Sequence, residues 1–545
     1  MASNILGIGQ SALAAAQVGL STTGHNIANA ATPGYTRQVV VQGAAMAQDF
    51  GFGFLGQGTE ISTVKRVYNE YLGTQVRSAQ TAKSGMDSYY GQIRQIDNML
   101  ANPTSGLSPV LQNFFSGIQE LASNPSSIPA RQAALSSAES LVARFQSMAY
   151  QLNEMAGGVN SQIVSSTADI NTYAVQIAQL NDSIGRAQRA TGQPPNDLLD
   201  QRDQLVLDLG KEIKATVVKQ GDGDYNIFIG NGQPLVVGGK TYTLSNVSSP
   251  TNPEKLEVAY TAANGSTVIV GESGLSGGRL GGLIEFRSKT LEPAQNALGR
   301  VAIGLGSTFN AQHQLGFDLN GVAGGDFFTV SAPFVGASGS NTGTATISAS
   351  ISNVNALTTS DYQVSYDGAN YTVTRLSDKT STTFASFPQT IDGVDLDLAS
   401  GSVLAGDIFL IRPTAKGASG MGMAITDPAG IAAAAVTGAV GDNRNALALG
   451  ALQTAKTLGN GTATFQGAFS QLVSQVGNKT RELELTSSAS GNLLAELTTS
   501  MQSESGVNLD EEATNLLRYQ QAYQAAAKSM QIAGELFDML LSIGR

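Results

Sequence analysis

The chain has 545 residues, a formal net charge of −11, no cysteine and only two histidines, His25 and His313. The lack of cysteine excludes disulfides, thiolate metal sites, iron–sulfur clusters and a cysteine nucleophile, and two isolated histidines do not make a histidine-rich metal site. Charged residues make up only 13%, about half the usual share of roughly 25%. A mildly acidic chain without a basic block is a poor partner for nucleic acid or an anionic membrane surface.

The first predicted element is an N-terminal helix with large apolar residues at every seventh position: Leu6, Leu13, Leu20 and Ile27. A small residue follows three positions after each: Gly9, Ala16, Thr23 and Ala30. This is the a/d pattern of a coiled coil with a small residue at d. The helix should end before Pro33-Gly34, because proline disfavours helix in the preceding residue and Pro-Gly suits the centre of a type II turn.

The N-terminus does not resemble a cleaved secretory signal. Its first charged residue is Arg37, whereas such a signal has a basic region before its apolar core. No apolar run reaches the roughly 18 residues of a membrane span, and the most apolar stretch, 430–440, is too short. We therefore expect no membrane insertion, and, if the protein is exported, a route without a standard cleaved signal.

A helical period continues from Ser78 to Lys211. Its longest apolar seam runs from Leu141 to Ile184, and about 60 residues of helix would span about 90 Å. Gly192 and Pro194-Pro195 should break this helix before a shorter one. Such lengths favour a rod-like helical bundle over a compact globule. Further helix is predicted at about 279–314, and again from about 442 to the end.

Two β-rich inserts interrupt the helices. The apolar period falls to two between about 215 and 271, with strand-like runs at 235–237, 242–244, 256–260 and 267–270. A second insert is predicted at about 326–413, with a hairpin across Asp367-Gly368. Because helix flanks each insert on both sides, the inserts should project from a rod built of widely separated segments.

The C-terminus repeats the seven-residue pattern of the N-terminus at Leu509, Leu516, Tyr523, Met530 and Phe537. The expected d partners are Ala513, Gln520, Ala527, Gly534 and Leu541. The two terminal segments would be about 45 and 50 Å long. Matching seams and lengths predict that the two ends pair with each other, the alternative being that each packs separately on a globular core.

The predicted fold is therefore multidomain α + β: an elongated helical coiled-coil or bundle rod, formed by N- and C-terminal segments, with two inserted all-β domains. The expected terminal coiled-coil assembly domain comprises 1–62 and 506–545. The helical rod domain comprises 63–212, 276–325 and 440–505, the first β insert 213–275, and the second β insert with its return linker 326–439.

Three motifs could suggest chemistry, but each has the wrong context. The G-x-G-x-x-G at 51–56 is followed by a strand-like segment instead of the helix of a dinucleotide site. The D-x-D-x-N at 222–226 resembles the opening of a calcium loop, but its sixth and twelfth positions are Ile227 and Gln233. A loop and a hairpin turn are the better interpretations, and no metal or cofactor is expected.

The third motif, G-x-S-x-G at 274–278, gives the best enzyme hypothesis. Ser276 would be a nucleophile with His313 as its base, oriented by Glu285 or Glu292. That fold needs a parallel sheet with helical crossovers, and no segment alternates in that way. A glycine-rich hinge is the favoured interpretation, so the chain is predicted not to be an enzyme.

Several segments carry a resemblance to a known family. T-T-G-H-N-I-A-N-A-A-T-P-G-Y-T-R at 22–37 resembles the N-terminal signature of the bacterial flagellar axial proteins, which include rod, hook and hook-associated proteins. P-N-D-L-L-D-Q-R-D-Q-L at 195–205, L-G-G-L-I-E-F-R at 280–287 and G-V-N-L-D-E-E-A at 506–513 resemble the hook-associated protein 1 family. The family often carries Asn where this chain has His25. The second β insert contains no recognised motif.

The resemblance implies a non-enzymatic structural protein at the junction between hook and filament, outside the cell. It implies export of the unprocessed chain through the flagellar type III channel. The implied partners are copies of itself in a ring, the hook protein, hook-associated protein 3, and an export chaperone at the C-terminal helix. The alternative is another axial protein, hook- or rod-like, whose outward β domains are adhesive.

The expected assembly interface combines the two apolar seams with the turn after the first helix. Asn26, Asn29 and Tyr35 should satisfy polar groups at the helix end and fix the turn, which also contains Pro33 and Gly34. Ordinary helix-end capping is the alternative role for the two asparagines. Since the N-terminal seam has few large residues, we expect roughly 1–62 and 506–545 to be mobile in the free monomer and ordered in the assembly.

Overall fold

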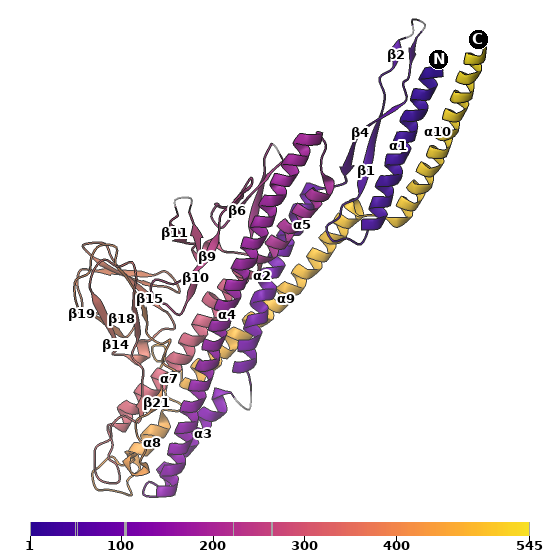
Figure 1. Cartoon of the computed structure of the whole chain (residues 1–545). Coiled ribbons are helices and arrows are strands. Elements are labelled where there is room, and N and C mark those ends of the chain that lie inside the picture. Colours follow the sequence, from indigo (N-terminus) through magenta and orange to yellow (C-terminus); the bar gives the residue numbers. More distant parts are fainter. Residues whose placement is uncertain are drawn as a thin grey trace.

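A computed structural model describes residues 2–543 except 50, 52, 103–105, 222, 263 and 264. The molecule is elongated: long helices run along a rod, the β inserts project from one side, and both termini lie at one end (Figure 1). The fold is multidomain α + β, as predicted, with long helices at both ends of the chain and β structure between helical segments.

The rod consists of helices that come from three separate parts of the sequence. They are α2 (Glu70–Leu100), α3 (Leu107–Ser123), α4 (Ile128–Thr191), α5 (Asn196–Glu212), α6 (Gly278–Phe286), α7 (Glu292–His313), α8 (Arg444–Ala451) and α9 (Phe465–Ser505). A single π-helical turn, Arg287–Leu291, joins α6 to α7.

Helix α4 confirms the predicted long helix, with 64 residues. The Ser127 side chain caps its start by accepting a hydrogen bond from the Ala130 N–H, and Gly192 ends it in the left-handed region at φ 68°. The predicted seam from Leu141 to Ile184 is buried against the neighbouring helices, except that Met155 is only half-buried. Burial of this continuous row of apolar side chains stabilises the long helix in the rod.

The first β insert contains two small antiparallel sheets. One comprises β5 (Ala215–Lys219), β6 (Tyr225–Ile229), β7 (Gln233–Val237) and β8 (Lys240–Thr241), and the other β9 (Leu244–Ser248), β10 (Leu256–Thr261) and β11 (Thr267–Ile269). The strand predicted at 242–244 is wrong for Tyr242 and Thr243, because the chain there crosses from the first sheet to the second.

The second β insert also has two antiparallel sheets. The five-stranded sheet contains β13 (Phe334–Ala337), β15 (Tyr362–Tyr366), β16 (Tyr371–Arg375), β17 (Ser381–Phe384) and β20 (Ile408–Arg412). The three-stranded sheet contains β14 (Thr346–Ile351), β18 (Gln389–Ile391) and β19 (Val394–Ser400). The predicted hairpin is confirmed, since Tyr366 pairs with Tyr371 across the turn. Two short strands, β12 (Phe328–Thr329) and β21 (Gly422–Met423), pair where the insert joins the rod.

A β ribbon follows the first helix and was largely missed by the sequence prediction, which had only a strand-like run at 61–64. Its long strands are β1 (Gln38–Ala44) and β4 (Thr59–Arg66), and its tip contains β2 (Gln48–Asp49) and β3 (Phe54–Leu55). The glycine-rich motif at 51–56 lies at this tip, where Gly51 and Gly53 have positive φ. No helix follows it, and its Phe52 lies outside the described residues.

Candidate functional site

The two ends of the chain pair as antiparallel helices, α1 (Ala2–Asn29) and α10 (Leu509–Ile543), which confirms the predicted pairing (Figure 1). The β ribbon packs along α1, and the pair continues the rod beyond α9. Two close approaches fix the register. A Cβ on Gly9 would lie 2.6 Å from the Met530 side chain, and one on Gly19 would lie 2.5 Å from the Tyr519 ring.

Small residues form the buried seam of this terminal pair. On α1 the predicted d positions Gly9, Ala16 and Thr23 are buried, whereas Ala30 lies past the helix and is exposed. On α10 the buried positions are Glu512, Ala526 and Ala533. The prediction was therefore one residue out on α10, where Ala513, Gln520 and Ala527 are exposed and Gly534 is half-buried. The Leu541 side chain lies outside the described residues.

The large apolar residues flank this seam, which corrects the expectation that they form it. On α1, Leu6, Leu13 and Leu20 are half-buried and Ile27 is exposed. On α10, Leu509, Leu516, Tyr523 and Phe537 are 55%, 36%, 39% and 44% exposed, and only Met530 is half-buried. The physical reason is that the two glycines of α1 leave space for the side chains of Met530 and Tyr519, and buried alanines on both helices let the backbones approach, so the other large residues lie beside the contact.

The flanking residues form one surface, which we call the apolar stripe: Leu6, Leu13, Leu20 and Ile27 of α1 with Leu509, Leu516, Tyr523 and Phe537 of α10. At about 100° per residue, each set lies to one side of its helix's seam. Because the helices are antiparallel, both sets lie on the same side of the pair. The stripe is therefore a continuous, half-exposed apolar surface.

In dilute protein we expect the terminal pair to unfold locally, starting at the end that carries the two chain termini. The small side chains of the seam bury little apolar area, and each Å² stabilises the pair by only about 25 cal/mol. Ordering the helices costs roughly 1–2 kcal/mol of backbone entropy per residue, so the net stability of the pair is low. Hydrogen exchange should show weak protection of amides near Leu13 and stronger protection near Asn26, whose side chain is hydrogen-bonded to the turn, β1 and α10. Strong protection of residues 8–20 in the monomer would contradict this.

A cluster of polar residues lies where the terminal pair meets the rod, and we call it the joint: Asn26, Asn29, Tyr35, Thr36, Arg37, Gln38, Arg66, Asp197, Asp200 and Glu512. It includes the predicted turn. The Tyr35 N–H donates to the Thr32 carbonyl at 3.2 Å, and Gly34 at the third turn position has φ 78°, as a type II turn requires. A Cβ on Gly34 would also lie 2.7 Å from Oε1 of Gln204 on α5. The sequence prediction of this turn after Pro33 is confirmed.

Asn26 lies at the centre of the joint and is 1% exposed. Its Nδ2 donates to the Gln38 carbonyl at 2.9 Å and to Glu512 Oε2 at 3.0 Å. Its Oδ1 accepts from the Gln38 N–H at 3.0 Å and from the Tyr35 hydroxyl at 2.7 Å. Burial raises the pKa of Tyr35, so the phenol stays a neutral donor. Asn26 thus links α1, the turn, β1 and α10, which is more than helix-end capping.

Asn29 has the more local role. Its Nδ2 donates to the His25 carbonyl at 3.0 Å, and its Oδ1 accepts from the Thr32 hydroxyl at 3.2 Å. These contacts close the end of α1, as ordinary capping would. The His25 ring lies 3.2 Å from Asp197 Oδ1 on α5, so this side chain also contacts the rod.

Arg37 joins the turn to the last two helices. Its Nε is 2.9 Å from Glu512 Oε1, its guanidinium is 2.9 Å from Glu511 Oε2, and its backbone N–H donates to the Ser505 carbonyl at the end of α9. Glu512 is 2% exposed, so this carboxylate is buried between the Arg37 guanidinium and the Asn26 amide. Burial with both oxygens bonded makes Glu512 the main polar contact between α10 and the joint.

A second set of contacts ties the turn and the β ribbon to α5. Asp200 accepts from the Thr36 N–H at 2.9 Å and from the Thr36 hydroxyl at 2.7 Å. The Arg66 guanidinium on β4 lies 2.7 Å from both Asp200 and Asp203. Gln38 Nε2 donates to Asp197 at 2.7 Å. The joint therefore fixes the terminal pair to the rod through α5 as well as through α9.

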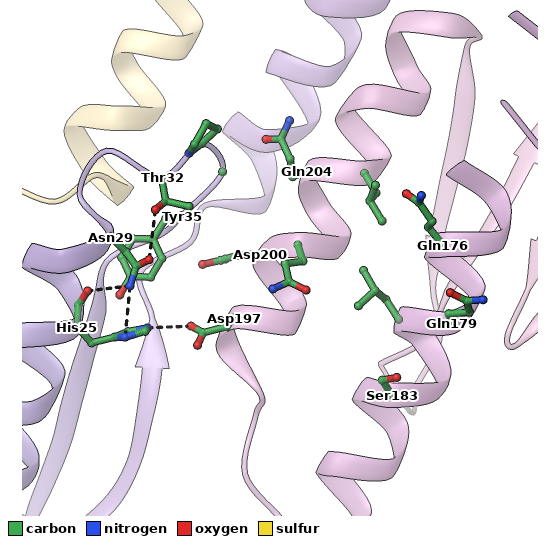
Figure 2. A pocket seen from close by; sticks show the side chains of 15 residues that line it. His25, Asn29, Thr32, Tyr35, Gln176, Gln179, Ser183, Asp197, Asp200 and Gln204 are labelled. Atoms are coloured by element: carbon green, nitrogen blue, oxygen red, sulfur yellow. Dashed lines mark hydrogen bonds and ion pairs between the residues drawn. The ribbon is translucent and has the colours of Figure 1, made fainter. Parts of the chain in front are cut away.

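A cavity of about 660 Å³ lies beside the joint, between the turn and helices α4 and α5. Figure 2 shows His25, Asn29 and Tyr35 on one side, Asp197, Asp200 and Gln204 between, and Gln176, Gln179 and Ser183 of α4 opposite. Its lining is mostly uncharged, and its carboxylates are already bonded to Thr36, Arg66, Gln38 and His25. It is a gap next to a satisfied polar network.

The other candidate chemical residues have structural environments. Both ring nitrogens of buried His313 are bonded to backbone, Nδ1 to the Gly325 carbonyl and Nε2 to the Ala432 N–H, each at 2.8 Å. Burial lowers the pKa of His313, which keeps it neutral. Gly277 and Gly278, after Ser276, both have positive φ, as the hinge interpretation expects.

The described part of the chain also bears on metal and membrane binding. Within it, no group of three or more histidine, aspartate or glutamate side chains is placed to hold a metal ion. Asp222, the first residue of the calcium-like motif, is outside that part. No described helix combines the length and apolarity of a membrane span.

Comparisons with known proteins agree with this arrangement. Family models match at 93–328 (the flagellar hook-associated protein FlgK helical domain), 337–413 (the D2-like domain of flagellar hook-associated protein 1), 6–36 (flagella basal body rod protein) and 498–543 (flagellar basal body rod FlgEFG protein C-terminal). The last two matches cover the two helices of the terminal pair.

Whole-chain relatives extend the likeness. The chain is 39% identical to flagellar hook-associated protein 1 of Escherichia coli (strain K12), over 99% of this chain and 100% of the relative. It is 27% identical to the Bacillus subtilis protein of the same name, over 99% of each. The solved flagellar hook junction protein FlgK of Burkholderia pseudomallei aligns with a TM-score of 0.75 and 31% identity, over 79% of this chain and 99% of that one.

Proposed function

Because this chain belongs to the flagellar hook-associated protein 1 family, we propose that copies of it form a ring at the hook–filament junction through the apolar stripe of the terminal pair. The protein is a non-enzymatic structural component of that junction and part of the extracellular flagellum. The ring and its subunit contacts are proposed in addition to this role, and the half-exposed apolar stripe is the observation that supports them.

The stripe supports self-assembly because a soluble monomer gains nothing by exposing it. Together with the half-buried Met530, four residues repeat at seven-residue spacing on α10 yet contact no helix of their own chain closely enough to be buried: Leu509, Leu516, Tyr523 and Phe537. A row of large residues at this spacing suits packing against a neighbouring helix. If the stripe of one copy packs on a different face of the next copy's terminal pair, the contact is head-to-tail, and repeating it around an axis closes a ring.

In this proposal, residues 1–62 and 506–545 form the assembly domain and 63–212, 276–325 and 440–505 the rod, with 213–275 and 326–439 as projecting β domains. Axial neighbours would be the hook protein on one side and hook-associated protein 3 on the other. The chain would leave the cell unprocessed through the flagellar type III channel, for which the absence of cysteine is favourable because no disulfide can form on the way. The exposed apolar residues of α10 would bind an export chaperone before assembly.

The test uses the absence of native cysteine. A strain without the gene should make hooks that carry no filaments, and Thr382→Cys on exposed β17 should restore the filaments. Maleimide-gold bound to that cysteine should appear in electron micrographs as one band at the distal end of the hook. Gold spread along the filament, or filaments in the deletion strain, would contradict the proposed role.

A further inference from the structure

We propose that the tip of the β9–β10 hairpin, residues 249–255, is a second anchor that fixes the angle of the second β insert to the rod. The hairpin belongs to the first insert, but its tip reaches between the rod and the second insert. The two β domains would then move with the rod as one body.

The first anchor of the second insert lies along one face of α7. Asn296 Nδ2 donates to Asp361 Oδ1 at 2.9 Å, and the buried side chain of Ile303 belongs to the apolar core of the insert. Gly299 allows very close contact, since a Cβ there would lie 1.8 Å from the Thr414 carbonyl. The same side of the insert also bonds to the loop before α9, since the Asn460 N–H donates to the Asn355 carbonyl at 2.8 Å and the Gly461 N–H donates to Asn355 Oδ1 at 2.7 Å. Asn355 itself lies in a short helical turn that contacts α7, so a contact away from α7 would restrain the angle of the insert from another side.

The hairpin tip is held firmly to the rod. Lys255 Nζ lies 3.2 Å from Glu292 at the start of α7 and 3.0 Å from Glu272. Burial alone would lower the pKa of Lys255, but these carboxylates outweigh burial and raise it, so the ammonium stays charged. Arg287 in the π-helical turn donates to the Leu256 carbonyl at 2.5 Å, and Asn160 of α4 donates to the Glu254 carbonyl at 2.9 Å.

The other side of the same tip touches the second insert. The Gly339 N–H donates to the Pro250 carbonyl at 3.0 Å. At Gly336 on β13, an added Cβ would lie 2.0 Å from the Thr251 carbonyl, so only glycine permits this approach. The tip therefore lies between the rod and the second insert. Ion pairs hold it to the rod, and backbone contacts hold it to the insert.

The experiment measures distances between spin labels in the full chain. Labels at Gln151→Cys on α4 and Thr382→Cys on β17, both exposed positions, report the angle of the insert without competing cysteines. We expect one narrow distance peak for the wild-type background. Gly336→Val, which collides with the tip, should lose that peak and give a broad or shifted distribution. Gly339→Val is the matched control and should keep it, because its Cβ would have nothing within 4 Å.

A second variant leaves the second insert unchanged. Replacing 249–255 by Asn-Gly closes the hairpin with a two-residue turn, because Ser248 and Leu256 are already paired. This variant should also lose the narrow peak, while hydrogen exchange of β15 and β16 stays as in the wild type. A narrow, unshifted peak in the Asn-Gly variant would overturn the proposal, whatever Gly336→Val does to folding.

Discussion

Leu516→Glu should abolish filament attachment while leaving the monomer folded. Leu516 is 36% exposed in the free chain, so a carboxylate there stays hydrated until a second copy covers it. On assembly the charge would be buried without a partner, which costs several kcal/mol or forces protonation. Electron microscopy should show bare hooks, and the cells should be non-motile.

Two controls make this result interpretable. Gln521→Glu adds the same charge about 140° further round α10, in a polar row with the exposed residues Lys528 and Glu535, and should be tolerated. Secreted protein must be quantified in the same cells, since loss of export would point to the chaperone contact instead of the ring.

Replacing 326–413 by a short Gly-Ser linker should impair filament attachment much less than Leu516→Glu does. Normal filaments in Leu516→Glu, with a failed junction in the insert deletion, would reverse this division of roles.

Glu512→Ala should release the terminal pair from the joint. The substitution leaves the Arg37 guanidinium and the Asn26 amide without their buried acceptor, and breaking such a pair costs about 3 kcal/mol. That corresponds to roughly hundredfold faster hydrogen exchange at protected amides near Asn26 and Gln38. The matched control is Glu511→Ala. Glu511 contacts the same arginine, but its side chain is 56% exposed, so its loss should cost less than about 1 kcal/mol. Equal effects of the two variants would show that the joint does not depend on the buried carboxylate.

The sequence predicted most of the helices and the pairing of the ends, because the relevant signals are local. Seven-residue apolar repeats, the Gly192 and Pro194-Pro195 break and the Pro33-Gly34 turn each act through neighbouring residues. The ribbon strand β1 was missed, since its residues Gln38–Ala44 include two glutamines and a glycine and show no strict alternation. The seam of α10 was misplaced by one residue because the prediction put the partner of each large residue four positions after it, whereas the buried positions Glu512, Ala526 and Ala533 lie three positions after.

The joint could be predicted only in part. Asn26, Asn29 and Tyr35 were expected to act at the turn, and the structure brings them together there. Glu512, Arg37 and Asp200 were not assigned roles, because their partners lie in distant parts of the chain. A weak signal was present: in a chain with 13% charged residues, these charges fall beside the turn or within the segments 195–205 and 506–513. Composition can mark such residues as unusual, but pairing them requires the fold.

The central claim is that the apolar stripe is free in the monomer and covered in the junction. The most direct measurement is the maleimide reactivity of Leu516→Cys in purified protein and in isolated hooks that carry the junction, with Thr382→Cys on the projecting insert as the reference. Both cysteines should react in the free protein, and in the junction only Thr382→Cys should remain reactive. If Leu516→Cys reacts equally fast in both states, the stripe is not the assembly surface.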